Sequence, residues 1–209
     1  FTLPRGTIMG LIGENGAGKS TTINAVLDLI KRDDGSITYW GKELSQDPRQ
    51  LKEDIGVVFD GINFYETLTP AKVGKISAAA YRQWDPAVYK SYLEKFQLPS
   101  DKEIKTFSKG MKMKLCIANA LSHDPKLLIL DEATSSIDTR TERIVQDGMD
   151  KLMSGRTTFV IAHRLSTVRN ADCIMVLEQG QIIERGTHDQ LMEQKGKYYQ
   201  LYHGMFELS

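Results

Sequence analysis

The sequence has no excess of either charge and very little cysteine. Its 209 residues include 27 Lys and Arg and 27 Asp and Glu, so the formal net charge at pH 7 is zero. This balance argues against a nucleic-acid partner, because such proteins usually carry a basic excess or stripe. The two cysteines, Cys116 and Cys173, lie in apolar segments. We expect both to be buried, reduced packing residues rather than a disulfide, which suits a reducing cytoplasm.

Long hydrophobic runs are also missing. No segment reaches the roughly 18 consecutive apolar residues that a membrane-spanning helix needs. The longest runs, Leu127–Leu130 and Phe159–Ala162, have the length of buried strands. The first ten residues are interrupted by glycine and charge, so they do not predict a secretory signal peptide. The remaining composition, 41% apolar and 26% charged, is typical of one globular domain with or without an inserted lobe.

The order of the apolar segments predicts an α/β fold with a mainly parallel sheet flanked by helices. Between residues 70 and 122 the strand patterns stop and helical patterns replace them. We therefore expect one domain, with an α/β core at residues 1–69 and 123–209 and an inserted helical subdomain at 70–122. The expected strands are Thr7–Ile12, Ser36–Trp40, Ile55–Phe59, Leu127–Leu130, Thr158–Ile161 and a hairpin of Ile174–Leu177 with Gln181–Glu184; helices are expected over Ile23–Ile30, over Thr141–Met153 and from His188.

One motif in this order predicts a phosphate-binding loop. Gly13–Ser20 reads GENGAGKS and matches G-x-x-x-x-G-K-[ST] at every fixed position, between a predicted strand and a predicted helix. The glycines let backbone N–H groups turn toward phosphates, and the positive end of the helix dipole points the same way. Lys19 is expected to bridge the β- and γ-phosphates, and the Ser20 hydroxyl to hold Mg²⁺. The candidate nucleotide-binding residues are Gly13, Asn15, Gly16, Ala17, Gly18, Lys19, Ser20 and Thr21.

A pair of carboxylates follows the buried strand Leu127–Leu130. Asp131 is expected at the carboxyl end of that strand, where a carboxylate linked to Mg²⁺ is needed. Glu132 points the other way along the strand and can polarise the attacking water. A pair of solvated acids at a strand end is the alternative, which the phosphate loop upstream disfavours.

Three further segments resemble those of ABC transporter ATP-binding domains. Phe107–Met111 (FSKGM) resembles the signature sequence of that family, and Ser135–Asp138 (SSID) resembles its D-loop. His163, at the end of a predicted strand in the string IAHRLST, resembles its switch histidine. The resemblance covers nearly the whole chain, and together with the phosphate loop these motifs are highly specific.

The resemblance implies an ATPase that works as a head-to-tail dimer, with two ATP molecules and Mg²⁺ between the subunits. One subunit supplies the phosphate loop and the catalytic groups, and Ser108 and Gly110 of its partner complete the site. A membrane-spanning subunit or domain would read the resulting motion, which implies a location at the cytoplasmic face of the cell membrane. The implied catalytic residues are Lys19, Glu132 and His163, and the implied metal ligands are Ser20, Asp131 and Asp60.

The chain departs from the pattern of the family at two of its motifs. Lys109 and Met111 replace a glycine and the glutamine of the usual LSGGQ signature, while Ser108 and Gly110 remain. We expect Lys109 to face solvent. Asp60 stands where the family has a glutamine that contacts Mg²⁺ or the attacking water. An ionised carboxylate cannot donate a hydrogen bond, so the hypothesis is that Asp60 alters this relay.

Two larger differences concern the ends of the chain. The family has earlier strands, which this sequence lacks, so we expect a reduced antiparallel β-subdomain around Ser36–Trp40. The family also has an aromatic residue that stacks on adenine. Phe1 lies too close to the phosphate loop to take that role, so we expect weaker nucleotide affinity. Gly13–Glu132 resembles separate ATP-binding subunits, whereas Thr139–Ser209 resembles domains fused to exporters. The sequence is therefore either a chimera joined between about residues 131 and 138 or one natural sequence with mixed features.

Two other functions stay open at this point. An ABC-type ATPase that acts on DNA or the ribosome is one, although no coiled-coil heptads separate Lys19 from Ser108. A folded scaffold without turnover is the other. The transported substrate and the direction of transport cannot be read from these residues.

Overall fold

The structure, a computed structural model, describes residues 1–44, 48–59, 61, 64–132, 153, 155–162 and 164–204, with Glu132 placed by its backbone alone. These residues belong to two compact units. Unit 1 consists of residues 1–52 and 157–209, and unit 2 of residues 53–156. Each unit combines parallel strands with helices, which confirms the predicted α/β class.

Unit 1 is built around four neighbouring strands in the order β6, β1, β7, β8. The first three are parallel, and β8 returns antiparallel to β7 through a tight turn. Side chains of β1 and β7 such as Met9, Ile12 and Ile174 are fully buried, as expected for strands covered on both faces. The strand bounds are β6 Thr157–Ala162, β1 Ile8–Ile12, β7 Cys173–Glu178 and β8 Gln181–Gly186.

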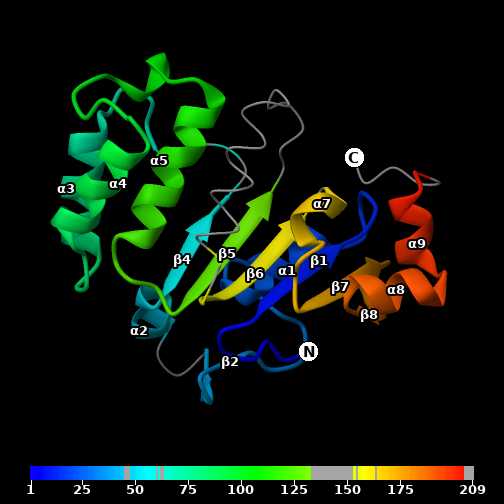
Figure 1. The fold of residues 1–209 in the computed structure, drawn as a ribbon. Coiled ribbons are helices and arrows are strands. Elements are labelled where there is room, and N and C mark those ends of the chain that lie inside the picture. Colours follow the sequence, from blue (N-terminus) through cyan, green and yellow to red (C-terminus); the bar gives the residue numbers. More distant parts are fainter. Residues whose placement is uncertain are drawn as a thin grey trace. The chain divides into compact units, whose positions relative to one another are not determined.

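Several helices of unit 1 come directly after its strands in the sequence. The phosphate loop leads from β1 into α1, and the predicted helical tail is present as α8 and α9, which lie beside β8 in Figure 1. Their bounds are α1 Lys19–Val26, α2 Pro48–Glu53, α7 Leu165–Val168, α8 His188–Gln194 and α9 Lys197–Tyr202.

Unit 2 pairs two parallel strands, β4 (Ile55–Val58) and β5 (Leu127–Glu132), with a group of helices. The helices are α3 (Pro70–Ala80), α4 (Pro86–Lys95), a 3₁₀ turn η1 (Ile104–Thr106) and α5 (Lys109–Leu121). They share one apolar cluster whose most buried members are Val73, Ile104, Leu115 and Ala118. All of these helices fall within the predicted helical subdomain, but its boundaries stay a prediction.

Several predicted elements are shorter than expected. The strand predicted at Ser36–Trp40 is only β2 (Thr38–Tyr39), because Trp40 and Gly41 have φ values of 51° and 83° and turn the chain into β3 (Lys42–Glu43). The first helix stops at Val26, and Ile30 is 39% exposed rather than part of its buried stripe. The helix predicted over Thr141–Met153 lies outside the described residues except for Met153.

No helix among the described residues is long and apolar enough to cross a membrane.

Candidate active site

The phosphate loop lies in unit 1 between the end of β1 and the start of α1. Gly13 has no room for a side chain, because a Cβ there would overlap the carbonyl oxygen of Leu177 and lie 3.1 Å from Ala17 Cβ. The loop then tightens through a hydrogen bond from Ala17 N to the Glu14 carbonyl at 3.1 Å. Gly18 caps α1 with a φ of 105°, a conformation that favours glycine. Gly13 is therefore required by close packing against Leu177, and Gly18 by its backbone conformation.

Lys19 places its ammonium group inside the loop. Its Nζ donates to the carbonyl oxygens of Gly13 at 2.6 Å and Glu14 at 3.0 Å, and the residue is only 6% exposed. A buried ammonium is stable only when oxygen acceptors surround it. The loop thus holds one positive charge against its own backbone carbonyls.

The loop is held in place by the hairpin of β7 and β8. Gly180 N, in the turn of that hairpin, donates to the Ala17 carbonyl at 2.8 Å. Lys197, the first residue of α9, contacts Glu14 Oε1 at 2.7 Å and Glu178 Oε1 at 3.1 Å. The sequence analysis missed both contacts, because a single lysine in a helical tail has no motif around it.

The predicted ligands suit ATP and Mg²⁺ by their chemistry. Asn15, Gly16, Ser20 and Thr21 are exposed around the loop, and a Cβ at Gly16 would meet nothing within 4 Å, so the backbone there can be approached. The hydroxyl of Ser20 and the carboxylate of Asp131 are hard oxygen donors of the kind that Mg²⁺ takes together with nucleotide phosphates. The two residues belong to different units, and each is described within its own.

In unit 2 the predicted carboxylates stand at the carboxyl end of β5. The strand Leu127–Leu130 is buried throughout, and Val58 at the end of β4 pairs with Leu130. Asp131 is partly buried, whereas the side chain of Glu132 lies outside the description. The end of a buried parallel strand is the edge at which ligands of α/β folds bind.

The predicted signature residues begin α5. Ser108 is the N-cap, and its exposed hydroxyl accepts a hydrogen bond from Met111 N at 3.2 Å. Gly110 is buried in the first turn, and Lys109 is exposed, as predicted. The positive dipole end of this 13-residue helix therefore lies at an exposed serine, which itself caps one of the first N–H groups.

The comparisons with known proteins decide what these parts belong to. A family model described as ABC transporter matches residues 1–135, well over half of the 209 residues. The chain belongs to the ABC transporter family. Within that family it is an ATP-binding domain of the ATPase type. It is similar to the solved structure of an ATP-binding subunit of an ABC transporter, with a TM-score of 0.82 and 30% identity, over 94% of this chain and 85% of that one.

Curated relatives of this ABC domain are larger proteins. One is a probable multidrug resistance ABC transporter ATP-binding/permease protein of Bacillus subtilis, 37% identical over 212 residues, with 97% of the chain and 32% of the relative covered. Another is an ATP-dependent lipid A-core flippase of Pseudomonas fluorescens, 38% identical, with 96% and 35% covered. A bacterial Atm1-family ABC exporter with ATP bound has a TM-score of 0.84 and 28% identity, over 98% of this chain and 38% of that one. The ABC domain spans about a third of the length of these relatives.

The relatives match both parts of the ABC domain that the sequence analysis treated separately. Coverage of 96–97% means that a single relative aligns with the Gly13–Glu132 part and with the Thr139–Ser209 part alike. Whether the chain is a chimera stays a prediction, and residues 133–138 of the proposed joint lie outside the described residues.

Two predicted site residues of the ABC domain cannot be placed. Asp60 and His163 lie outside the described residues, as does the D-loop at Ser135–Asp138. Phe1 packs against Phe159 of β6, with ring centroids 5.6 Å apart, while 60% of the residue stays exposed. The roles of all these residues therefore stay predictions.

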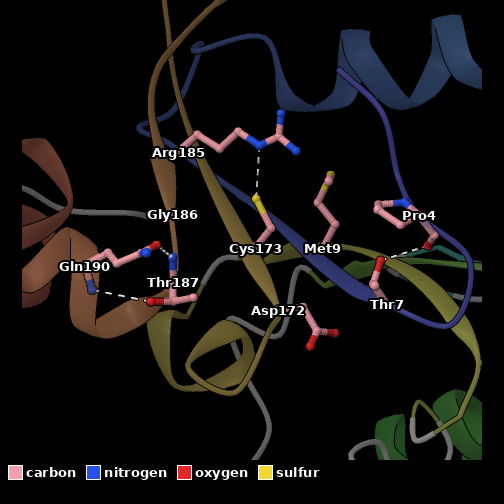
Figure 2. Close-up of a pocket in the computed structure, with 9 residues that line it drawn as sticks. All are labelled: Pro4, Thr7, Met9, Asp172, Cys173, Arg185, Gly186, Thr187 and Gln190. Atoms are coloured by element: carbon pink, nitrogen blue, oxygen red, sulfur yellow. Dashed lines mark hydrogen bonds between the residues drawn. The ribbon is translucent and has the colours of Figure 1, made fainter.

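The ABC domain has a second concavity in unit 1, a pocket of about 420 Å³ (Figure 2). Cys173 lines this pocket and is only partly buried, so the prediction that it is buried was wrong. Cys116 is buried, as predicted. Cys173 is the first residue of β7, and Arg185 Nε donates to its Sγ at 3.3 Å (Figure 2). Because Cys173 lies at the end of a strand and its neighbour Arg185 is exposed, one side of the thiol faces the pocket. Neither cysteine forms a disulfide within the described residues, which agrees with the prediction.

Proposed function

We propose that this ATP-binding domain powers export by a membrane-spanning partner and works at the cytoplasmic face of the cell membrane. One observation carries the proposal: a probable ATP-binding/permease protein aligns with 97% of this chain, yet the match covers only about a third of that protein. The remaining two thirds would supply the path for the substrate. Motions of the ATP-binding domain would drive the conformational changes that open and close that path.

Within the domain, Lys19 would neutralise the β- and γ-phosphates and Ser20 and Asp131 would hold Mg²⁺, with Asp60 as a further ligand through a bound water. Bound Mg²⁺ supplies positive charge that stabilises the developing charge on the phosphates. Glu132 would accept hydrogen-bond donation from the attacking water and orient it. His163 would contact the γ-phosphate and report its presence. The phosphate loop supports the first role, because its buried ammonium already faces the loop carbonyls.

A second copy of the domain, or a related one, would complete each site. The exposed Ser108 and the first N–H groups of α5 form an anion-binding helix terminus that carries no acidic residue in its first turn. Gly110 would allow close approach of a phosphate. ATP would thus join two domains head to tail, and hydrolysis would release them.

An ATPase assay tests the proposal directly. The purified 209-residue chain should release phosphate in the presence of Mg-ATP, and Glu132→Gln should reduce the rate about 100-fold or more, since it removes the carboxylate that positions water. Lys19→Ala should also abolish nucleotide binding. A rate that is indifferent to both substitutions would mean a contaminating activity, and a chain that binds no nucleotide would be a scaffold.

A further inference from the structure

The C-terminal helix α9 touches the phosphate loop through a cluster of charged side chains. Lys197 Nζ lies 2.7 Å from Glu14 Oε1, in the loop, and 3.1 Å from Glu178 Oε1, at the end of β7. The lysine side chain is only 16% exposed, whereas the two carboxylates are 39% and 45% exposed. One ammonium thus joins three segments that are far apart in the sequence.

The backbone around Lys197 is fixed as firmly as its side chain. Glu184 of β8 accepts hydrogen bonds from the N–H groups of Lys197 and Tyr198, the latter at 2.9 Å. Tyr198 is fully buried, and its hydroxyl lies 2.7 Å from His188 Nδ1 of α8. The Glu14 carboxylate, and to a lesser degree that of Glu178, raises the pKa of the Lys197 ammonium above its ordinary value. Lys197 therefore reaches the loop from an anchored position.

Glu14 connects this cluster to the nucleotide-binding lysine. Its carbonyl oxygen accepts from Lys19 Nζ at 3.0 Å, while its carboxylate faces Lys197. Without Lys197, two carboxylates would stand uncompensated beside a loop that receives a polyanion, and like charges in a partly buried setting repel. Glu14 would also lose the ion pair that fixes its side chain.

From these contacts we infer that Lys197 is a positioning residue for nucleotide binding, which neutralises Glu14 and Glu178 and holds the phosphate loop in its binding conformation. The inference rests on the proposed ATP site and adds the C-terminal helix to it. Lys197 itself does not touch the nucleotide in this account. It acts through Glu14.

Calorimetric titration of Mg-ATP into variants of the 209-residue chain tests the inference. Lys197→Met should raise the dissociation constant about 3- to 10-fold, the effect of leaving a partly buried charge without its partner. Lys197→Arg keeps the charge and should stay within about twofold of the wild type. Lys195→Met, which removes the same charge two residues earlier, is the matched control and should leave affinity unchanged. The loss in Lys197→Met should shrink as salt is raised, because screening weakens the repulsion.

A double substitution separates positioning from simple loss of structure. Lys197→Met with Glu14→Gln removes the uncompensated carboxylate and should bind ATP more tightly than Lys197→Met alone. General damage to α9 would not be repaired by a change in the phosphate loop. The inference is overturned if Lys197→Met binds like the wild type, if Lys195→Met is equally weakened, or if Glu14→Gln restores nothing. Failure of the proposed function would look different: the wild type would then bind no better than Lys19→Ala, and Lys197 would have no site to serve.

Discussion

His123 is an ionisable side chain that folding removes almost entirely from water. It is 1% exposed, its ring stacks on Tyr81 at a centroid distance of 4.0 Å, and its Nε2 lies 3.2 Å from the Ile55 carbonyl. Because a carbonyl only accepts, this contact requires a proton on Nε2. Burial lowers the pKa of His123 below its ordinary value of 6.5, and hydrogen bonds to backbone carbonyls offset only part of that effect.

This burial predicts a loss of stability in mild acid. The unfolded chain binds a proton at His123 below pH 6.5 while the folded chain resists it, so the free energy of unfolding should fall as the pH drops from 6.5 toward 5. Above pH 6.5 the contribution is fully present. Urea unfolding at several pH values would measure the slope. In His123→Gln the slope should be shallower than in the wild type, whereas His203→Gln, which removes an exposed imidazole, should keep it. Equal slopes in all three would refute the assignment.

At the residue scale, the phosphate loop could be predicted and its supports could not. Gly18, with its positive φ, and Lys19, which donates to a carbonyl of its own loop, are fixed by local geometry, so a short motif contains the information that places them. Gly13 is also crowded by Leu177 of β7, a contact that the motif does not contain. Lys197 contacts Glu14 only because the chain returns to the loop after β7 and β8, and no local pattern records such a return. Cys173 was wrongly expected to be buried for the same reason: its exposure depends on where β7 begins.

The residue before helix α9 is Gly196, and a carboxylate occupies the space where its side chain would lie. A Cβ at Gly196 would overlap Glu184 Oε1 and lie 2.9 Å from Glu184 Cδ, the side chain that caps the helix. That carboxylate accepts from both Lys197 N and Tyr198 N. The first turn of a six-residue helix has few other interactions to hold it, so the cap matters more than it would in a long helix.

Gly196→Ala should therefore destabilise the domain by about 1–3 kcal/mol, because the methyl group displaces the capping carboxylate. Glu184→Ala should cost a similar amount by removing the cap directly. The double variant should be little worse than either single one, since both remove the same interaction. Urea midpoints of the four proteins measure this coupling. Strict additivity of the two losses would show that Gly196 is needed for another reason.

Elements whose ends carry their own signals were the ones that the sequence predicted well. The Asp85-Pro86 dipeptide is such a signal, because Pro86 is the first residue of α4 and Asp85 Oδ1 accepts from Ala87 N and Val88 N at 2.8 and 3.1 Å. The strand Ser36–Trp40 was overextended because its apolar residues continue into a turn that only the φ values of Trp40 and Gly41 reveal. Apolar patterns predict that an element exists, and backbone conformation decides where it stops.

On the scale of the whole molecule, the mainly parallel α/β fold followed from the alternation of strands and helices, and the structure agrees within each unit. The working assembly is a different matter. The phosphate loop belongs to unit 1 and the signature serine to unit 2, and the proposed dimer joins the loop of one copy to the serine of another. Sequence motifs identify both halves of such a site, but not which copy supplies each.

Mixing two inactive variants would show which copy supplies them. Lys19→Ala removes the ammonium that we propose binds phosphate, and Ser108→Arg blocks the exposed N-terminus of α5, so each should have little ATPase activity alone. A mixed head-to-tail dimer contains one intact site, made of Lys19 from the Ser108→Arg copy and Ser108 from the Lys19→Ala copy, and one site that lacks both. The mixture should therefore regain up to about a quarter of the wild-type rate, because half of the dimers are mixed and half of their sites are intact. Were Lys19 and Ser108 to act on the same nucleotide within one copy, every copy in the mixture would still lack one of them and no activity would return.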